Sequence, residues 1–99
     1  MGENRAVYWE QQAEHHLNKI IDYLLKEWYW QVAKKFYEQV FATVDTLVEQ
    51  PYLGRPIRGT TESFSFPVGY YRLVYFFDEK RIVITDIVDM RSEQAIKNE

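Results

Sequence analysis

The sequence predicts a single α+β domain over residues 1–99, in which a pair of helices packs on one face of a small antiparallel sheet. Three observations lead to this prediction: a short β-prone opening, two stretches with helical spacing of apolar residues, and three β-type segments after them. Helices that come before a run of strands are typical of α+β folds. A chain of 99 residues has the size of one domain, with little room for a second core. The predicted order is β-α-α-β-β-β.

The N-terminal strand is predicted at residues 5–9, and the helical pair follows it. Apolar side chains recur at helical spacing in two stripes: Leu17, Ile20, Ile21, Leu24 and Trp28, then Val32, Phe36, Val40, Val44 and Leu47. One continuous helix over residues 10–50 would be roughly 60 Å long, whereas a compact domain of this size has a radius of gyration of about 13 Å. We therefore expect two helices folded back as an antiparallel hairpin and ended by Pro51, which lacks an N–H group.

The second half of the chain predicts a three-stranded antiparallel run. Residues 62–66 alternate between polar and apolar, as in a half-buried strand, and residues 67–69 have the composition of a turn. Residues 71–77 and 82–88 are apolar on both faces, which indicates two central strands joined by a polar hairpin loop at residues 78–81. Residues 90–99 form a polar C-terminal tail, which we expect to fray or to form a short helix.

The composition excludes several classes of protein. Twelve basic and fifteen acidic residues give a net charge of −3, which excludes a strongly cationic nucleic-acid-binding domain. The absence of cysteine excludes a disulfide framework, a thiolate zinc site and a cysteine nucleophile. No apolar run approaches the ~20 residues of a membrane-spanning helix, and the first residues lack the apolar stretch of a signal peptide. We expect a cytoplasmic protein without membrane contact, and no spacing implies a metal ion or a cofactor.

Two polar pairs have simple structural interpretations. His15 and His16 are neighbours on the first predicted helix and point about 100° apart, so they cannot chelate one metal ion together. We expect both of them on a solvated helix face. Asp86 and Asp89 have the spacing of paired carboxylates near a strand end, but two solvent-facing acids at a sheet edge are the simpler interpretation.

The arginines are the most suggestive polar set, because five of the six lie in the second half of the chain. Arg72 stands inside an apolar strand, where a charge is costly unless it is paired or used. Arg91 follows the last strand, and Arg55 and Arg58 flank the loop before the sheet. One interpretation is a site for an anion or a phosphate group. The other is ion pairing with one of three acids: Glu62, Asp86 and Asp89. The spacing does not separate the two.

Three bulky aromatic residues, Trp28, Tyr29 and Trp30, meet at the junction of the two predicted helices. Side chains on one turn point in different directions, so at least one of the three is expected to be exposed. An exposed aromatic residue beside a helical hairpin can anchor a partner or a second copy of the chain. Core packing and partner contact both remain open for this cluster.

Three segments together resemble the RelE/ParE superfamily of bacterial type II toxins, in the right order and over nearly the whole chain. They are residues 21–36, with Ile21-Asp22-Tyr23 and Trp28; residues 47–56, which end in Pro51-Tyr52-Leu53-Gly54-Arg55-Pro56; and residues 71–91, with Tyr71-Arg72-Leu73-Val74-Tyr75 and Asp89-Met90-Arg91. The resemblance implies a helical hairpin on a small antiparallel sheet. It also implies a toxin that a small cognate antitoxin protein neutralises.

The superfamily contains RelE-type toxins, which are ribosome-dependent messenger-RNA endonucleases. Arg72 and Arg91 match the two arginines that hold the scissile phosphate in that branch, and Arg58 matches a third basic position in the loop. The two strand positions that carry lysines there are Ser63 and Ser65, and the late tyrosine position falls near Lys97. General acid–base help contributes about 10²–10⁴-fold to such reactions, so this departure counts against an enzyme.

The long helical hairpin and the Pro-Tyr-Leu-Gly-Arg loop resemble the ParE branch more closely, the branch that includes plasmid stabilisation proteins. The resemblance implies growth inhibition by binding, with DNA gyrase as the target and without catalysis. The expected antitoxin- or target-binding residues are Trp28, Tyr29, Trp30, Arg55, Arg72 and Arg91. The first alternative is a RelE-like endonuclease that acts on ribosome and mRNA through Arg72, Arg91 and Arg58. The second is a non-toxic binding module, and a homodimer is possible in each case.

Overall fold

The computed structural model describes residues 5–59 and 62–91 and confirms the α+β class. The elements in chain order are β1 (Ala6–Trp9), α1 (Gln11–Glu27), α2 (Trp30–Glu49), the 3₁₀ helix η1 (Pro51–Leu53), β2 (Arg55–Pro56), β3 (Phe64–Val68), β4 (Tyr71–Phe77) and β5 (Arg81–Asp89). The predicted tail over residues 90–99 lies mostly outside the described residues, of which only Met90 and Arg91 belong to it.

The strands form one sheet in the order β1-β5-β4-β3-β2. The three predicted strands β3, β4 and β5 pair antiparallel, as expected. Strand β1 adds to the outer side of β5 and runs parallel to it, so the sheet is mixed, not purely antiparallel. A parallel pair needs a long connection, and here the helical hairpin and β2 to β4 all lie between the two strands in the sequence.

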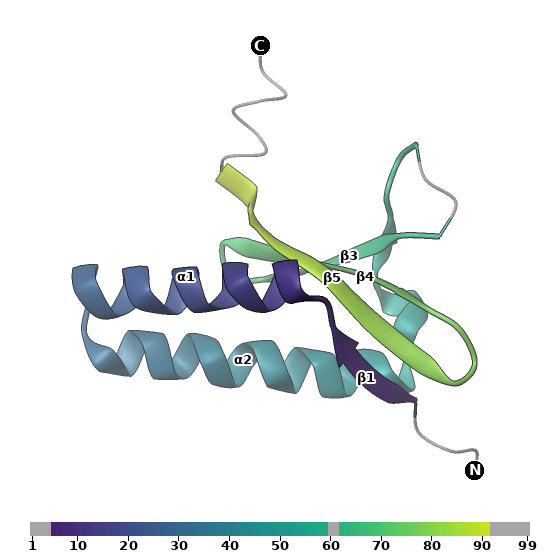
Figure 1. The fold of residues 1–99 in the computed structure, drawn as a ribbon, viewed down its shortest axis with the longest axis horizontal. Helices are drawn as coiled ribbons and strands as arrows, with labels where there is room; N and C mark the ends of the chain where they lie inside the picture. The colour runs from purple at the N-terminus through teal and green to yellow at the C-terminus, as the bar shows by residue number, and fades with distance from the viewer. Residues whose placement is uncertain (1–4, 60–61, 92–99) are drawn as a thin grey trace.

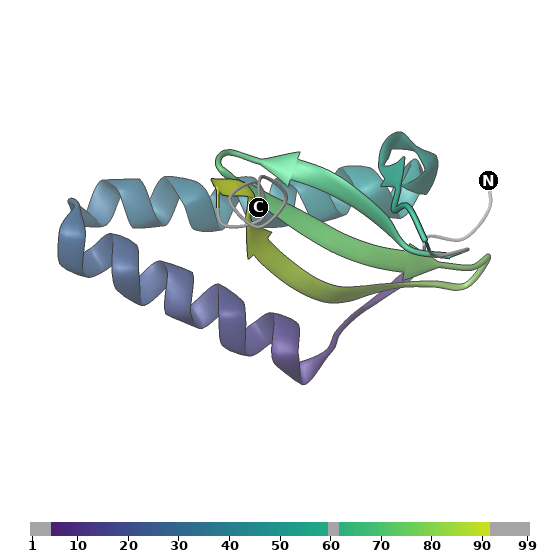
Figure 2. The ribbon, with the colours of Figure 1, turned by 90° about the horizontal axis from the view of Figure 1, so that it is seen from above.

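The two helices form the predicted antiparallel hairpin, which extends well beyond the sheet (Figures 1 and 2). The reversal takes only Trp28 and Tyr29, both with extended backbone, between the end of α1 and the start of α2. Helix α1 buries Ala13, Leu17 and Leu24, which lie on one face at helical spacing. Because α1 and α2 are 17 and 20 residues long, they measure about 26 and 30 Å.

The core lies between α2 and the helix-facing side of the sheet. Alternate residues of β4 point into it, and they meet the buried stripe of α2 and the apolar residues of β5. The fully buried members with the largest side chains are Tyr75, Leu47, Leu73, Ile82, Ile84, Ile87 and Val40. This packing fixes β4 and β5, and therefore the position of every arginine on or after these strands.

The third strand differs from its prediction by two residues. It spans Phe64–Val68, and the turn falls at Gly69, whose φ of 63° is in the region that favours glycine. Pro67 therefore lies inside the strand, paired with Arg72 of β4. The position tolerates proline because β2 pairs only with Phe64 and Ser65, so that β3 has no strand on its other side at Pro67.

Candidate functional site

The hairpin tip, which we define as Trp28, Tyr29 and Trp30, is exposed at all three residues. Their exposed fractions are 57%, 78% and 61%. The prediction that at least one of them is exposed is confirmed, because the tip lies beyond the end of the sheet and no element within residues 5–59 and 62–91 covers it (Figures 1 and 2). Large apolar groups gathered at one place on a surface are typical of contact sites for other proteins.

An open groove runs from the tip along the outer side of the two helices. Its volume is about 510 Å³, and its lining residues are Ile21, Leu25, Trp30, Ala33, Lys34, Tyr37 and Glu38. We call this set the helical groove. Lys34 and Glu38 form the only charged part of its lining, with Lys34 Nζ donating to Glu38 Oε2 at 2.8 Å. The hairpin thus presents a mainly apolar surface of some length and not isolated exposed rings.

Arg91 is held by the carboxylate of Asp89, which confirms one of the predicted ion pairs. Arg91 Nε donates to Asp89 Oδ1 at 3.1 Å and Nη2 donates to Oδ2 at 3.0 Å, a two-point contact. The hydrogen bond to Asp89 raises the pKa of Arg91, so the guanidinium stays charged. Any anion that binds Arg91 has to compete with this carboxylate.

Three tyrosines lie near Arg91, whose side chain is otherwise largely exposed, and sequence reasoning did not associate any of them with it. The guanidinium lies over the ring of Tyr70 at 5.2 Å from the ring centre. Tyr71 and Tyr23 lie close enough to interact with its charge. Burial, and to a smaller extent the charge of Asp89, raises the pKa of Tyr71 above 10.0, so this hydroxyl is a poor base at neutral pH. The pairing of Tyr71 with Asp89 across β4 and β5 creates the cluster, and only the strand register reveals it.

Arg72 lies at the same end of the sheet but on the opposite face. Tyr71 and Leu73 point toward the helices, so Arg72 between them points away, beside Pro67 and Val88 on the neighbouring strands. Its Nη2 group donates to the Met90 sulfur at 3.6 Å. The structure thus places Arg72 and Arg91 near Met90 with different partners.

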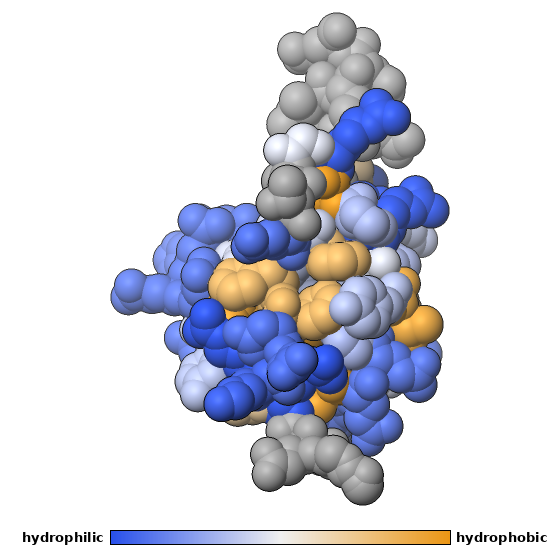
Figure 3. Space-filling model, turned by 90° about the vertical axis from the view of Figure 1, so that its right-hand side faces the viewer, coloured by the Kyte–Doolittle hydropathy of each residue, from blue (hydrophilic) through white to orange (hydrophobic). Residues whose placement is uncertain are grey.

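The two loop arginines lie apart from this end. Arg55 on β2 pairs with Ser65 and is exposed. Arg58 follows in a turn beyond β2, next to the start of β3, and the antiparallel register puts it at the opposite end of the sheet from Arg72. Residues 51–58 belong to the end of the molecule that faces the viewer in Figure 3, where apolar and charged side chains are mixed. The four predicted arginines therefore do not form one cluster.

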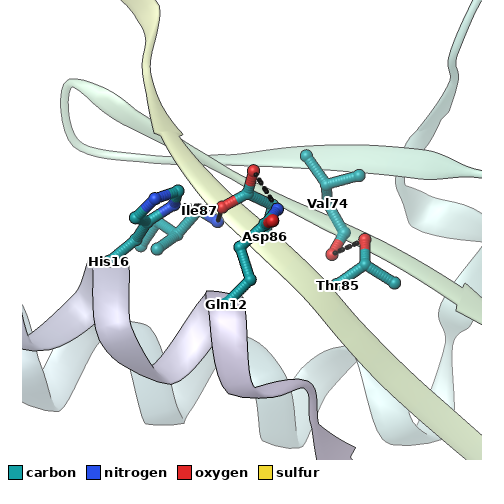
Figure 4. A network of polar contacts seen from close by, with 6 residues as sticks. All are labelled: Gln12, His16, Val74, Thr85, Asp86 and Ile87. Carbon is teal, nitrogen blue, oxygen red and sulfur yellow. Dashed lines mark hydrogen bonds and ion pairs between the residues drawn. The ribbon is translucent and has the colours of Figure 1, made fainter.

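Asp86 joins β5 to α1 and is therefore not the solvent-facing acid expected at this sheet edge (Figure 4). Strand β1 pairs with β5 only over Arg81–Ile84, so β5 is itself the edge at Asp86, and α1 contacts the carboxylate there. Asp86 Oδ1 accepts from the Ile87 N–H at 2.8 Å and lies 2.6 Å from His16 Nδ1, while Oδ2 accepts from Gln12 Nε2 at 3.0 Å. Because a carboxylate only accepts, His16 Nδ1 carries the proton of this contact.

His16 is therefore a structural residue and not part of a purely solvated face, whereas His15 is exposed as expected. The contact forms where the register of β4 and β5 shifts at Val74 and Tyr75, beside a bond from Thr85 Oγ1 to the Val74 carbonyl at 3.2 Å (Figure 4). Within residues 5–59 and 62–91, no group of three or more His, Asp or Glu side chains is arranged to hold a metal ion. Nor does this part of the chain contain a helix that is both long and apolar enough to cross a membrane.

A family model described as the ParE toxin of the type II toxin–antitoxin system parDE matches residues 7–93. Among solved structures, the chain is similar to a chromosomal ParDE toxin–antitoxin system from P. aeruginosa, with a TM-score of 0.74 at 18% identity over 86% of this chain and 95% of that chain. It is also similar to the YoeB dimer from Staphylococcus aureus, with a TM-score of 0.65 at 17% identity over 87% and 97% of the two chains.

A third similar structure is the toxin–antitoxin complex RelBE2 from Mycobacterium tuberculosis, with a TM-score of 0.61 at 23% identity over 88% of this chain and 99% of that chain. At these identities the structural likeness shows a shared fold alone. Comparison with curated protein sequences gives no match. The family model and the fold therefore agree, and the family model covers most of the chain.

Proposed function

The chain belongs to the ParE toxin family of type II toxin–antitoxin systems, and from this premise we propose that it inhibits growth by binding DNA gyrase in the cytoplasm. In this proposal the chain acts without catalysis, and a cognate antitoxin protein neutralises it by covering part of the same surface. The hairpin tip carries the contact with the target. Arg55, Arg72 and Arg91 add charged contacts to the antitoxin or the target.

The exposure of the hairpin tip is the observation that carries the proposal. Trp28, Tyr29 and Trp30 contribute little to the core, yet they are the residue types that contribute most to binding at protein interfaces. Leaving such large apolar side chains in water has no benefit for folding, since burying one typically stabilises by about 1.5–3 kcal/mol. A surface of this kind at the end of a rigid hairpin suits insertion into a partner.

The arrangement of the arginines favours binding over RNA cleavage. Asp89 already occupies the hydrogen-bonding edge of Arg91, and Arg72 points to the other face of the sheet. Arg58 lies at the far end of the sheet. A phosphate clamp made of these three residues would need a large rearrangement. If the RelE-like alternative used Tyr71 near Arg91 as its base, the raised pKa would keep this tyrosine protonated at neutral pH.

The test is inhibition of supercoiling by purified gyrase, with wild-type chain compared to two variants. We expect Trp28→Ala/Tyr29→Ala to weaken inhibition at least about 100-fold, because two anchor residues of about 2 kcal/mol each are lost. We expect Arg72→Ala to change the inhibition of supercoiling by less than about tenfold, since a charge at the rim of an interface contributes less to binding than a buried anchor residue. The free energy of unfolding of each variant is measured in parallel, so that loss of folding is not mistaken for loss of binding.

Two results would overturn this proposal. One is a wild-type chain that leaves supercoiling unchanged at all concentrations. The other is cleavage of ribosome-bound mRNA by the purified chain, abolished by Arg72→Ala, which would establish the endonuclease alternative.

A further inference from the structure

We infer that the helical groove is a self-association surface, on which a second copy of this chain packs in the absence of other partners. The inference concerns the groove along α1 and α2 and is independent of the proposed target. It follows from three properties of the lining residues, namely the arrangement of their charges, their shape and their exposed area.

The charges of the groove are complementary to themselves. Lys34 and Glu38 are one turn apart on α2, and their side chains are 60% and 62% exposed. If two copies pack with their α2 helices antiparallel about a two-fold axis near residue 36, Lys34 of each copy faces Glu38 of the other. Lys34 and Glu38 already pair within each copy at 2.8 Å, and in this arrangement each of them also faces an opposite charge on the other copy. No like charges meet within the lining set.

The same axis also makes the shapes complementary. Ala33 is the small residue of the lining, and Tyr37, one turn further along α2, is a large one. In the antiparallel arrangement, Tyr37 of one copy lies against the depression at Ala33 of the other. Trp30 of each copy approaches α2 of the other copy near Phe41. There it meets an aromatic pair, since the ring centres of Tyr37 and Phe41 lie 4.8 Å apart within each chain.

The exposed area is sufficient for a specific interface of the weaker kind. Five lining side chains are exposed by half or more: Leu25, Trp30, Tyr37, Lys34 and Glu38. At about 100 Å² each they offer about 500 Å² per copy, so two copies bury about 1,000 Å², the lower bound for a specific interface. A dimer of this size is expected to dissociate at micromolar concentrations.

Charge reversal within the groove tests the inference by sedimentation equilibrium of the full chain, made by cell-free synthesis. Lys34→Glu sets acidic groups opposite each other in both halves of the interface, and Glu38→Lys does the same with basic groups. Each variant alone is expected to raise the dimer dissociation constant by about tenfold or more. An equimolar mixture of the two restores opposite charges at both contacts and is expected to recover association between the two variants.

Lys35→Glu is the matched control. Lys35 is exposed and lies about 100° round α2 from Lys34, outside the groove. The substitution Lys35→Glu changes the net charge by the same amount as Lys34→Glu, so the general repulsion between copies is equal in the two variants. We therefore expect Lys35→Glu to form a dimer as stable as that of the wild type.

The inference is wrong if the wild-type chain remains monomeric up to about 100 µM. It is equally wrong if a dimer forms that neither charge reversal weakens, or if the mixed variants fail to associate while each variant remains folded. None of these results bears on inhibition of gyrase, because the readout is the mass of the chain alone.

Discussion

At Gly54 the backbone passes so close to Tyr75 that a larger residue does not fit. A Cβ atom at this position would lie 2.8 Å from Tyr75 Cζ and 3.0 Å from the Ser65 carbonyl, and closest of all to the Tyr75 hydroxyl. That hydroxyl is buried and donates to the Pro51 carbonyl at 2.6 Å. The Pro-Tyr-Leu-Gly-Arg loop therefore has a physical role, which is to attach the end of α2 to the centre of the sheet.

Substitutions at this contact are expected to be coupled. Gly54→Ala should lower the free energy of unfolding by about 1–3 kcal/mol through overpacking. Tyr75→Phe should lower it by about 1–3 kcal/mol, because the buried Pro51 carbonyl loses its donor. The loss of free energy of unfolding in the double variant should be clearly smaller than the sum of the two single losses. The reason is that the Tyr75 hydroxyl, which the new methyl group would meet, is then absent. Urea unfolding of the four proteins measures the coupling, and strict additivity would contradict the proposed close contact.

Burial of tyrosines also predicts a loss of stability in alkali. Burial raises the pKa of Tyr75 and of Tyr71 above 10.0, so both hydroxyls favour the protonated state in the folded chain. Below pH 10.0 the two hydroxyls make their full contribution to the free energy of unfolding. This contribution is lost as the pH rises from 10.0 through the higher pKa of the folded state. We expect the free energy of unfolding to fall above pH 10.0, with a smaller fall in Tyr75→Phe. Denaturant unfolding from pH 9 to about 11.5 measures both, and identical pH dependence in the two proteins would contradict the assignment to Tyr75.

Among the elements, α1 is held to the sheet by polar contacts with Asp86 as well as by its apolar stripe. The Asp86 carboxylate on β5 accepts from the Ile87 backbone and from the Gln12 side chain, and it contacts His16. The contact lies at the N-terminal half of α1, close to the point where β1 leaves the sheet (Figure 4). It fixes the direction in which the hairpin leaves the sheet.

Removal of this carboxylate should loosen α1 before the rest of the fold. Asp86→Ala leaves the donors of Gln12, His16 and Ile87 without their acceptor and should lower the free energy of unfolding by about 1–3 kcal/mol. Hydrogen exchange should rise first in the N-terminal half of α1. His15→Ala, at the exposed neighbouring position, is the control and should stay within about 0.5 kcal/mol of the wild type. Equal effects of the two substitutions would show that the contact does not stabilise α1.

The elements that have a clear local pattern of apolar residues could be predicted from the sequence. The features that depend on which strands pair with each other could not. Both helices have long periodic patterns, the strands β4 and β5 are continuous apolar segments, and the structure confirms all four elements. Strand β2 has two residues and no period, and β1 finds a parallel partner that lies more than 70 residues away in the sequence. The error at Pro67 has the same origin, since the composition of a turn does not reveal that one side of β3 is unpaired.

The features of the candidate site also divide into those that the sequence could predict and those that it could not. Exposure of the hairpin tip could be predicted, because three adjacent aromatic side chains cannot all face one core. The pair of Arg91 with Asp89 was among the alternatives that the spacing allowed. The tyrosines around Arg91 and the contact of His16 with Asp86 could not be found, because each joins residues from different elements through the strand register or helix packing.

On the scale of the whole molecule, the sheet and the helices have separate tasks. The sheet and one side of α2 form the core, whereas the outer side of the hairpin and its tip remain available for contacts (Figure 2). A tip that inserts into a target and a groove that pairs two copies share Trp30. Self-association would therefore reduce the fraction of chain that is free to bind a target, most strongly at high concentration.

The most direct test of the central claim is pulse-labelling of DNA and protein synthesis in bacteria within minutes of induction of this chain alone. Inhibition by binding gyrase predicts that DNA synthesis stops first while protein synthesis continues. Trp28→Ala/Tyr29→Ala should then leave both syntheses unchanged, because the anchor residues of the hairpin tip are absent. Protein synthesis that stops before DNA synthesis, and that depends on Arg72, would contradict this account and identify an endonuclease.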